Sequence, residues 1–290
     1  MKRLVKNRFV KNTGWILAGR IVQMVLSLAV NMLVARYLGP ERHGIINYVN
    51  SFILFFSSLC TLGLNNVIIK ELVSNKNEDG KILGSALFMR LISSLISMSL
   101  LIIIIYLLNK GDKLILLIAF LQSFSLVFSA IDVICYWYQS KLKSKVTTIA
   151  QTIAYLIMSL YKVLLVIFKK NLAWFGFSIS LDYMLVAIIL FIVYFKDKGQ
   201  RLTFSAPVAK RMIKQSYPLI ISGVMINIYG QIDKIMLGNM LDFSAVGLYT
   251  AAVTITGLWY FVPSSIIETA RPMIIEAKDT SNELFALRLK

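Results

Sequence analysis

The sequence has few of the residues that soluble enzymes use most. Of its 290 residues one is His and two are Cys, and only 14 are Asp or Glu against 31 Lys and Arg. A single His leaves little for acid–base catalysis near neutral pH. Both cysteines, Cys60 and Cys135, lie inside apolar runs, where they are expected to act as small buried hydrophobes rather than as a disulfide or a metal site.

Motifs for nucleotides and metals are absent as well. The chain contains no GxxxxGK[ST] for ATP phosphates, no HExxH for zinc, no GxSxG for a nucleophilic Ser and no Cys/His cluster with metal-ligand spacing. We therefore expect no catalytic residue, no metal and no cofactor. These absences favour a secondary transporter over an enzyme or an ATP-driven pump.

Apolar residues dominate what is present. Hydrophobic residues make up 58% of the chain and charged residues 16%, with a mean hydropathy of +0.73. Soluble domains are about half apolar and about a quarter charged. The net charge of +17 comes from Lys and Arg that lie between apolar runs rather than in one patch. This placement argues against a nucleic-acid partner and fits contact with anionic membrane lipids.

The apolar runs predict an all-α, polytopic bundle of about eight transmembrane helices. A span needs about 20 mostly apolar residues, and eight runs qualify: 13–35, 45–65, 82–108, 114–138, 147–168, 172–195, 217–241 and 245–270. Most joints are tight hairpins, of which Leu38-Gly39-Pro40 is the first. The joints 66–81 and 196–216 are longer, and Pro207 is expected to open a short amphipathic helix in the second, with Pro218 in the first turn of the next span.

The pattern also suggests two related halves. The turn around Leu38-Gly39 returns in part at Leu237-Gly238. We predict an N-terminal six-helix transmembrane lobe at 1–200, a basic cytoplasmic linker at 201–216, and the first two helices of an incomplete second lobe at 217–290. With so little of a second lobe, we expect the chain to be a fragment, a truncated reading frame or a degenerate copy.

Lysine and arginine set the orientation. Loops on the side of the N-terminus carry several times more of these residues than loops on the other side, which predicts a cytoplasmic N-terminus. The start MKRLVKNRFVK precedes an apolar stretch too long for a cleaved signal, so it is interpreted as leading an uncleaved first span.

Charged and amide side chains inside the spans are the candidate site. A charge facing lipid costs roughly 2.5–3.5 kcal/mol at the bilayer centre, so each should face protein or water. Helical spacing of 100° per residue places them on polar stripes. The proposed substrate-binding cations are Arg20, Arg90, Lys162 and Lys234. The polar or ion-coupling candidates are Gln23, Asn31, Asn47, Asn50, Asp132, Asp182, Asn227, Gln231 and Asp233.

Two interpretations of the stripes stay open. Ser, Thr and Asn side chains also join helices in packed membrane bundles, whereas cations on the same faces favour a shared, water-filled and positively lined cavity. Asp132 and Asp182 are either ion-pair partners of those cations or proton or cation sites. Asp233 points about 100° away from Lys234 and is a candidate for pairing with a neighbouring helix.

Several blocks of sequence carry a resemblance to a known family. They are NTGWILAGRIVQMVLSLAVNMLVARYLGPERHGIINYVNSF, TLGLNNVIIKEL, SAIDVICYWYQSKLKSK and QIDKIMLGNMLDFSAVGLYTAAVTITGLWYFVPSSII. Together they resemble polysaccharide-biosynthesis flippases of the Wzx type, in the superfamily that includes the MATE exporters and the lipid II flippase. The family's pattern commonly has Arg where this chain has Gln231, and an acid where it has Gly257.

The resemblance implies a fold, a substrate and a location. The fold is a MATE-like bundle of two lobes with a central, often cationic cavity. The substrate is undecaprenyl-pyrophosphate-linked oligosaccharide, moved across the bacterial cytoplasmic membrane by alternating access for O-antigen, capsule or exopolysaccharide synthesis. A polysaccharide polymerase or glycosyltransferases are candidate partners. The alternatives are a cation-coupled exporter of small molecules and an inactive, truncated membrane remnant.

Overall fold

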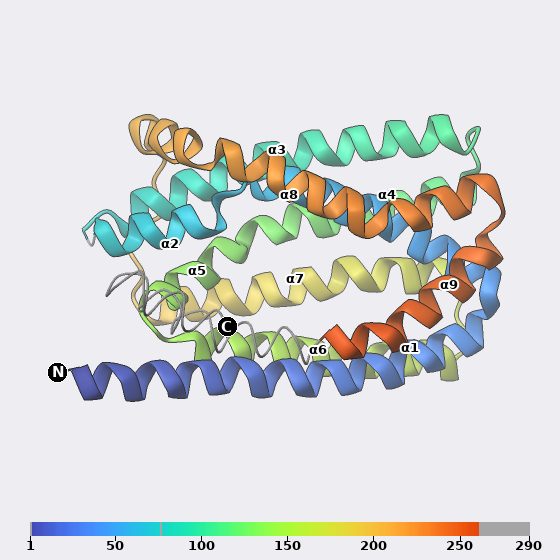
Figure 1. The fold of residues 1–290 in the computed structure, drawn as a ribbon, viewed down its shortest axis with the longest axis horizontal. Helices are drawn as coiled ribbons and strands as arrows, with labels where there is room; N and C mark the ends of the chain where they lie inside the picture. The colour runs from blue at the N-terminus through green and yellow to red at the C-terminus, as the bar shows by residue number, and fades with distance from the viewer. Residues whose placement is uncertain (1, 76, 261–290) are drawn as a thin grey trace, which may run out of the picture. The chain divides into compact units, whose positions relative to one another are not determined.

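The computed structural model describes residues 2–75 and 77–260, with side chains from residue 23 onward except those of 258 and 260. The chain divides into two compact units, Met1–Tyr249 and Thr250–Lys290. The elements of the first unit are α1 Lys2–Thr61, α2 Leu64–Ser74, α3 Asp79–Leu108, α4 Lys113–Ser129, the 3-10 turn η1 Ala130–Asp132, α5 Val133–Ser140, α6 Ser144–Ile167, α7 Leu172–Lys196, α8 Ala206–Met240 and the first part of α9 Phe243–Thr256 (Figure 1).

The prediction of an all-α, multi-pass membrane protein is confirmed. The described residues contain no strand and five segments that are long and apolar enough to cross a membrane. These segments are Gln23–Ser74, Asp79–Leu108, Lys113–Ser140, Ser144–Ile167 and Leu172–Lys196. The first holds two of the eight predicted spans, whereas α8 and α9 are not among the five. Part of the predicted span 245–270 lies outside the described residues.

The predicted turn at Gly39 divides α1 into two helical parts. Gly39 has φ 73° and ψ 170°, outside the helical region, and Pro40 follows it. A residue with a Cβ adopts such positive φ values only at a cost. The chain therefore reverses here and sends the second part of α1 back along the bundle (Figure 1).

Lysines close several of the apolar helices. The non-glycine residues with positive φ after α3, α6 and α7 are Lys110, Lys169 and Lys198. In each case the next N–H donates to a carbonyl five residues earlier, for example Lys170 N to Leu165 O at 3.0 Å. This is the Schellman arrangement, which satisfies carbonyls that the helix end leaves open. A cation at this position also suits the negative end of the helix dipole.

Consecutive turns lie at opposite ends of the bundle. At the Gly39 end, Tyr37 Oη donates to Lys170 O at 3.1 Å, and Asn109 Nδ2 donates to Tyr48 Oη at 3.4 Å. At the other end, called the Asp79 end, the Lys141 ammonium lies 3.1 Å from the Asp79 carboxylate, and Gly80 N donates to Gln200 Oε1 at 2.9 Å. Each long helix therefore runs from one end to the other, as a membrane-spanning segment does.

The outer surface of the bundle is apolar. Large side chains such as Leu95, Ile96 and Ile103 on α3 and Leu160 on α6 are more than half exposed. A soluble monomer rarely exposes contiguous apolar surface on this scale. Lipid chains are the environment that such faces fit.

Two helix boundaries differ from those predicted. The span expected to end at residue 65 continues as α2 to Ser74 after a break at Leu62 and Gly63, both with positive φ. The basic joint before residue 217 is not a separate helix, because α8 runs unbroken from Ala206 to Met240 with Pro218 inside it. Pro207 does occupy the first turn, where a missing N–H costs nothing.

Candidate functional site

A polar layer crosses the bundle between two apolar clusters. On α3 the apolar core at the Asp79 end includes Met89 and that at the Gly39 end includes Leu101. Between them lie three fully buried polar residues, Arg90, Ser94 and Ser97. A similar order recurs on the other central helices. Asp132 of η1 lies between Leu126 and Val133, and the polar residues of α7 between Phe175 and Leu190 include Ser178, Ser180 and Asp182.

Two helices are interrupted at this layer. The path of α1 into α2 breaks at Leu62–Gly63, and α4 passes into α5 through η1, which contains Asp132. Interrupted helices near the membrane midplane are the usual substrate and ion sites of secondary transporters, because they free backbone groups for binding. The sequence-based spans contained neither interruption.

Arg90 joins the two interruptions. Its guanidinium donates to Asn65 Oδ1 on α2 and lies 5.4 Å from the centre of the Tyr136 ring on α5. The Asp132 carboxylate is close enough to interact with it electrostatically. Arg90 is only 1% exposed, so neighbouring protein groups have to stabilise its charge. Whether Asp132 serves as an ion-pair partner or as a proton or cation site stays a prediction.

Lys162 and Asp182 form a second cluster between α6 and α7. The two charges are near enough to influence each other, and Tyr155 lies near Asp182 and Ser27 of α1. Ser27 in turn accepts a hydrogen bond from Asn31 Nδ2 at 3.1 Å. The two charged side chains are half-buried, so a polar ligand reaching this cluster would meet both signs of charge.

Lys234 lies in a third cluster, on α8. Its ammonium donates to Gln231 Oε1 at 2.9 Å. Asp233 instead accepts a hydrogen bond from the Tyr249 hydroxyl of α9, as expected for a carboxylate directed toward a neighbouring helix. Three of the four predicted cations, Arg90, Lys162 and Lys234, have described side chains, and each lies among different neighbours. A single cavity shared by all of them stays a prediction.

The remaining predicted residues are placed as follows. Asn47 Nδ2 donates to His43 O at 2.8 Å, a contact within α1, and Gln23 and Asn50 are half-buried on the same helix. Arg20 lies in α1, but its side chain is outside the described residues. None of these positions tests the predicted roles.

Asn227 lines a pocket of about 460 Å³ between α1, the start of α2 and α8. Its lining residues are Ser57, Ser58, Thr61, Gly63, Asn65, Asn66, Leu219, Ser222, Gly223, Ile226 and Asn227. Every one of them is uncharged, and Asn65 connects the pocket to Arg90 behind it. Pockets of about 300–1,000 Å³ are typical of small-molecule sites.

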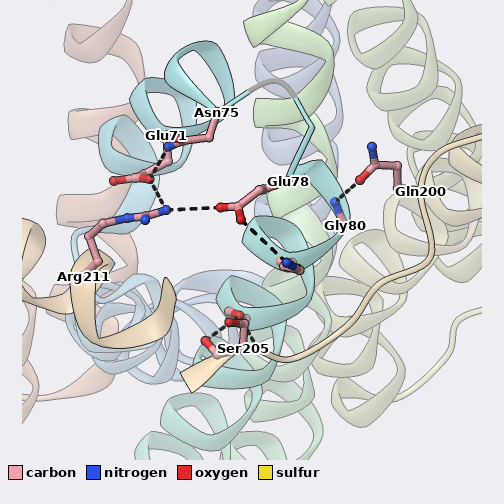
Figure 2. A network of polar contacts seen from close by, with 9 residues as sticks. Glu71, Asn75, Glu78, Gly80, Gln200, Ser205 and Arg211 are labelled. Carbon is pink, nitrogen blue, oxygen red and sulfur yellow. Dashed lines mark hydrogen bonds and ion pairs between the residues drawn. The ribbon is translucent and has the colours of Figure 1, made fainter. Parts of the chain in front are cut away.

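A charged network at the Asp79 end was not predicted. Arg211 at the start of α8 lies 2.8 Å from Glu71 of α2 and 3.6 Å from Glu78, which precedes α3 (Figure 2). Gln215 Nε2 also donates to Glu71, at 2.7 Å. These contacts join two residues of the predicted linker 201–216 to α2 and to the residue before α3. A signal was available, since Glu71 and Glu78 are two of only 14 acids in a strongly basic chain.

The described residues contain no group of three or more His, Cys, Asp or Glu side chains placed to hold a metal ion. Their polar groups are amides, hydroxyls and charge pairs set within apolar helices. Such groups bind and release polar ligands by hydrogen bonding and electrostatics.

Comparison with known proteins gives one match. No curated protein and no solved structure is similar enough to be a match for this chain. The family described as "Polysaccharide biosynthesis protein" matches residues 9–278, which include α1 from Phe9 on and all the later helices described above. The chain therefore belongs to the polysaccharide biosynthesis protein family.

Proposed function

We propose that this protein is a flippase that moves undecaprenyl-pyrophosphate-linked oligosaccharide across the bacterial cytoplasmic membrane. The observation that carries the proposal is the polar layer, with its charged side chains, in the middle of an apolar bundle of this family. Burying Arg90, Lys162 and Asp182 inside spans is costly, and such residues commonly mark a route for polar cargo. Sugars and phosphates need such a route through hydrocarbon.

The cations are proposed to neutralise the pyrophosphate. Lys162 and Lys234 are half-buried, so their ammonium groups remain accessible to a ligand, whereas the guanidinium of Arg90 is enclosed. A phosphate oxygen would replace the partner of each Lys, namely Asp182 or Gln231. Each lysine ammonium would thus have a polar partner in both states, a protein side chain when the site is empty and a phosphate oxygen when it is loaded. Its charge would then be stabilised throughout repeated transport cycles.

The architecture proposed for this work has two lobes, at 1–200 and 217–290, and a cytoplasmic N-terminus. With no ATP-binding motif in the sequence, the membrane potential or an ion gradient is the proposed driving force. Transport of the cargo would supply surface polysaccharide synthesis, and so the expected partners are the enzymes that build and polymerise it.

The test is transport in reconstituted vesicles. A fluorescent undecaprenyl-pyrophosphate-linked oligosaccharide is placed in one leaflet, and its arrival in the other is measured with a membrane-impermeant glycosidase. We expect Lys162→Gln and Lys234→Gln to slow transport about tenfold or more, since a charged hydrogen bond contributes about 1.5–3 kcal/mol.

The matched control is Lys170→Gln, at an exposed turn of the Gly39 end, which should transport at the unmutated rate. Circular dichroism would show whether each variant keeps its helices. Equal transport by the control, both single variants and their combination would contradict the role of the lysines. No transport by the unmutated protein would contradict the function itself.

A further inference from the structure

The pocket beside Asn65 has a lining unlike that expected for a pyrophosphate site. All eleven residues around its volume of about 460 Å³ are uncharged, and they offer amides, hydroxyls and two apolar side chains, Leu219 and Ile226. A pyrophosphate placed here would lose its water without meeting a contacting cation, which is unfavourable. An uncharged group with many hydroxyls would find both hydrogen-bond partners and apolar surface.

Arg90 determines which way the Asn65 amide faces. A guanidinium has only donors, so the atom of Asn65 that contacts it must be the carbonyl oxygen Oδ1. The NH₂ group of the same amide is left to face the pocket that Asn65 lines. Arg90 is buried and also packs over Tyr136, which keeps it from turning away. The pocket thus receives a hydrogen-bond donor in a fixed orientation.

Asn227 of α8, which also lines the pocket, is oriented by a similar chain of contacts. Ser58 Oγ donates its one hydrogen to Gly223 O at 3.0 Å, so it can only accept from Asn227. Asn227 therefore turns its NH₂ group to Ser58 and leaves Oδ1, an acceptor, for the pocket. The lining thus presents one fixed donor and one fixed acceptor.

We propose that this pocket is a saccharide subsite, in which Asn65 donates to a sugar oxygen and Asn227 accepts from a sugar hydroxyl. Arg90 acts as a positioning residue behind Asn65 and does not contact the ligand. Leu219 and Ile226 cover the apolar face of a sugar ring, and the uncapped start of α2 at Gly63 adds backbone donors. The inference rests on the proposed function and divides the cargo, with sugar here and phosphate at the lysine clusters.

The first test is protection of the pocket from a thiol reagent. Ser222→Cys places a thiol in the lining, and its alkylation by a maleimide is followed peptide by peptide by mass spectrometry in lipid nanodiscs. The probes are N,N′-diacetylchitobiose, which is neutral, and inorganic pyrophosphate. We expect the disaccharide to slow the reaction at position 222 and pyrophosphate to leave it unchanged. Lys170→Cys, at the Gly39 end, should react equally with and without either probe.

The second test replaces the hydrogen-bond donor at position 65 by an acceptor and keeps the contact with Arg90. Asn65→Asp has the same shape and still pairs with Arg90, so the fold is expected to stay intact, but it replaces the donor by an acceptor. It should raise the disaccharide concentration for half-protection about tenfold. Asn227→Asp keeps an acceptor facing the pocket and should change this concentration less than Asn65→Asp. Asn171→Asp, an exposed control at the start of α7, should not change it.

The outcomes separate this inference from the proposed function. Protection by pyrophosphate alone, or unchanged disaccharide protection in Asn65→Asp with a native melting temperature, would overturn the saccharide subsite. If lipid-linked oligosaccharide is still transported in that case, the proposed function stands without it. Disaccharide protection in a protein that moves no lipid-linked oligosaccharide would instead support the subsite and contradict the flippase.

Discussion

Glu71 is a buried carboxylate held by one donor from the end of its own helix, α2, and by two donors from α8. Asn75 Nδ2 lies 2.9 Å and Arg211 2.8 Å from Oε2, and Gln215 Nε2 lies 2.7 Å from Oε1. Glu71 is 5% exposed, whereas the Arg211 side chain is 43% exposed. The ion pair is therefore neither fully buried nor freely solvated, and it ties α8 to α2 (Figure 2).

At this scale we predict that Arg211→Gln destabilises the protein. Removing one partner leaves a buried carboxylate with fewer donors, and solvent screening at half-exposed Arg211 limits the loss to about 1–2 kcal/mol. The measurement is the thermal midpoint of helix unfolding in detergent. Lys214→Gln, an exposed cation one turn along α8, should stay within about 0.5 kcal/mol of the unmutated protein.

A double variant checks the pairing. Glu71→Gln with Arg211→Gln removes both charges, so its loss of stability should be smaller than the sum of the two single losses. Strict additivity would mean that the two side chains do not stabilise each other, despite their separation of 2.8 Å.

Among the elements, α1 and α9 meet at two glycines. A Cβ at Gly44 would overlap the carbonyl oxygen of Phe243, and one at Gly247 would overlap the carbonyl oxygen of Pro40. These glycines follow Leu38-Gly39 and its echo Leu237-Gly238, so the recurring segments of the sequence pack against each other. Backbone atoms rather than side chains form the contact, and they cannot rotate out of the way. Small residues allow this close approach of membrane helices.

Gly247→Ala should therefore loosen this contact. An added methyl group in a tight interface costs about 1–3 kcal/mol, and the expected readout is a lower thermal midpoint. Gly230→Ala on α8 is the matched control, because nothing lies within 4 Å of its Cβ position and Ala is the better helix former. We expect the control to be equal to or more stable than the unmutated protein. The reverse order of the two variants would disprove the close approach.

At the scale of the whole molecule, the Asp79 end is the basic end. It carries Lys141, Lys143 and Lys145 around one turn and Arg201, Lys210, Arg211 and Lys214 around another. The Gly39 end has fewer cations. The positive-inside rule then predicts that the Asp79 end faces the cytoplasm.

Cysteine labelling in cells can test this orientation. Lys170→Cys should react with a membrane-impermeant maleimide added to intact cells, and Lys143→Cys only after the membrane is permeabilised. Both side chains are exposed in turns, so a difference in labelling would reflect the side of the membrane and not a difference in solvent exposure. Labelling of Lys143→Cys from outside and protection of Lys170→Cys would reverse the predicted topology.

The sequence alone determined the class of structure and most helix ends. Apolar runs of span length, the Gly39-Pro40 turn and the short joints between the runs are local features, so they can be recognised without knowing the fold. The predicted start of α8 is wrong because the prediction places Pro218 in the first turn of the helix. A proline is also tolerated inside a membrane helix when neighbouring groups satisfy the freed backbone, and Pro218 lies inside α8.

Only the tertiary structure decided which polar groups meet. Hydropathy shows that Arg90 lies inside a span, but its contact with Asn65 depends on the break at Leu62–Gly63 and on the packing of α2 against α3. Glu71 and Arg211 are 140 residues apart, and no local pattern joins them. Helical spacing places a side chain on a face, whereas its partner is set by the neighbouring helix, and that choice arises only when the whole bundle packs.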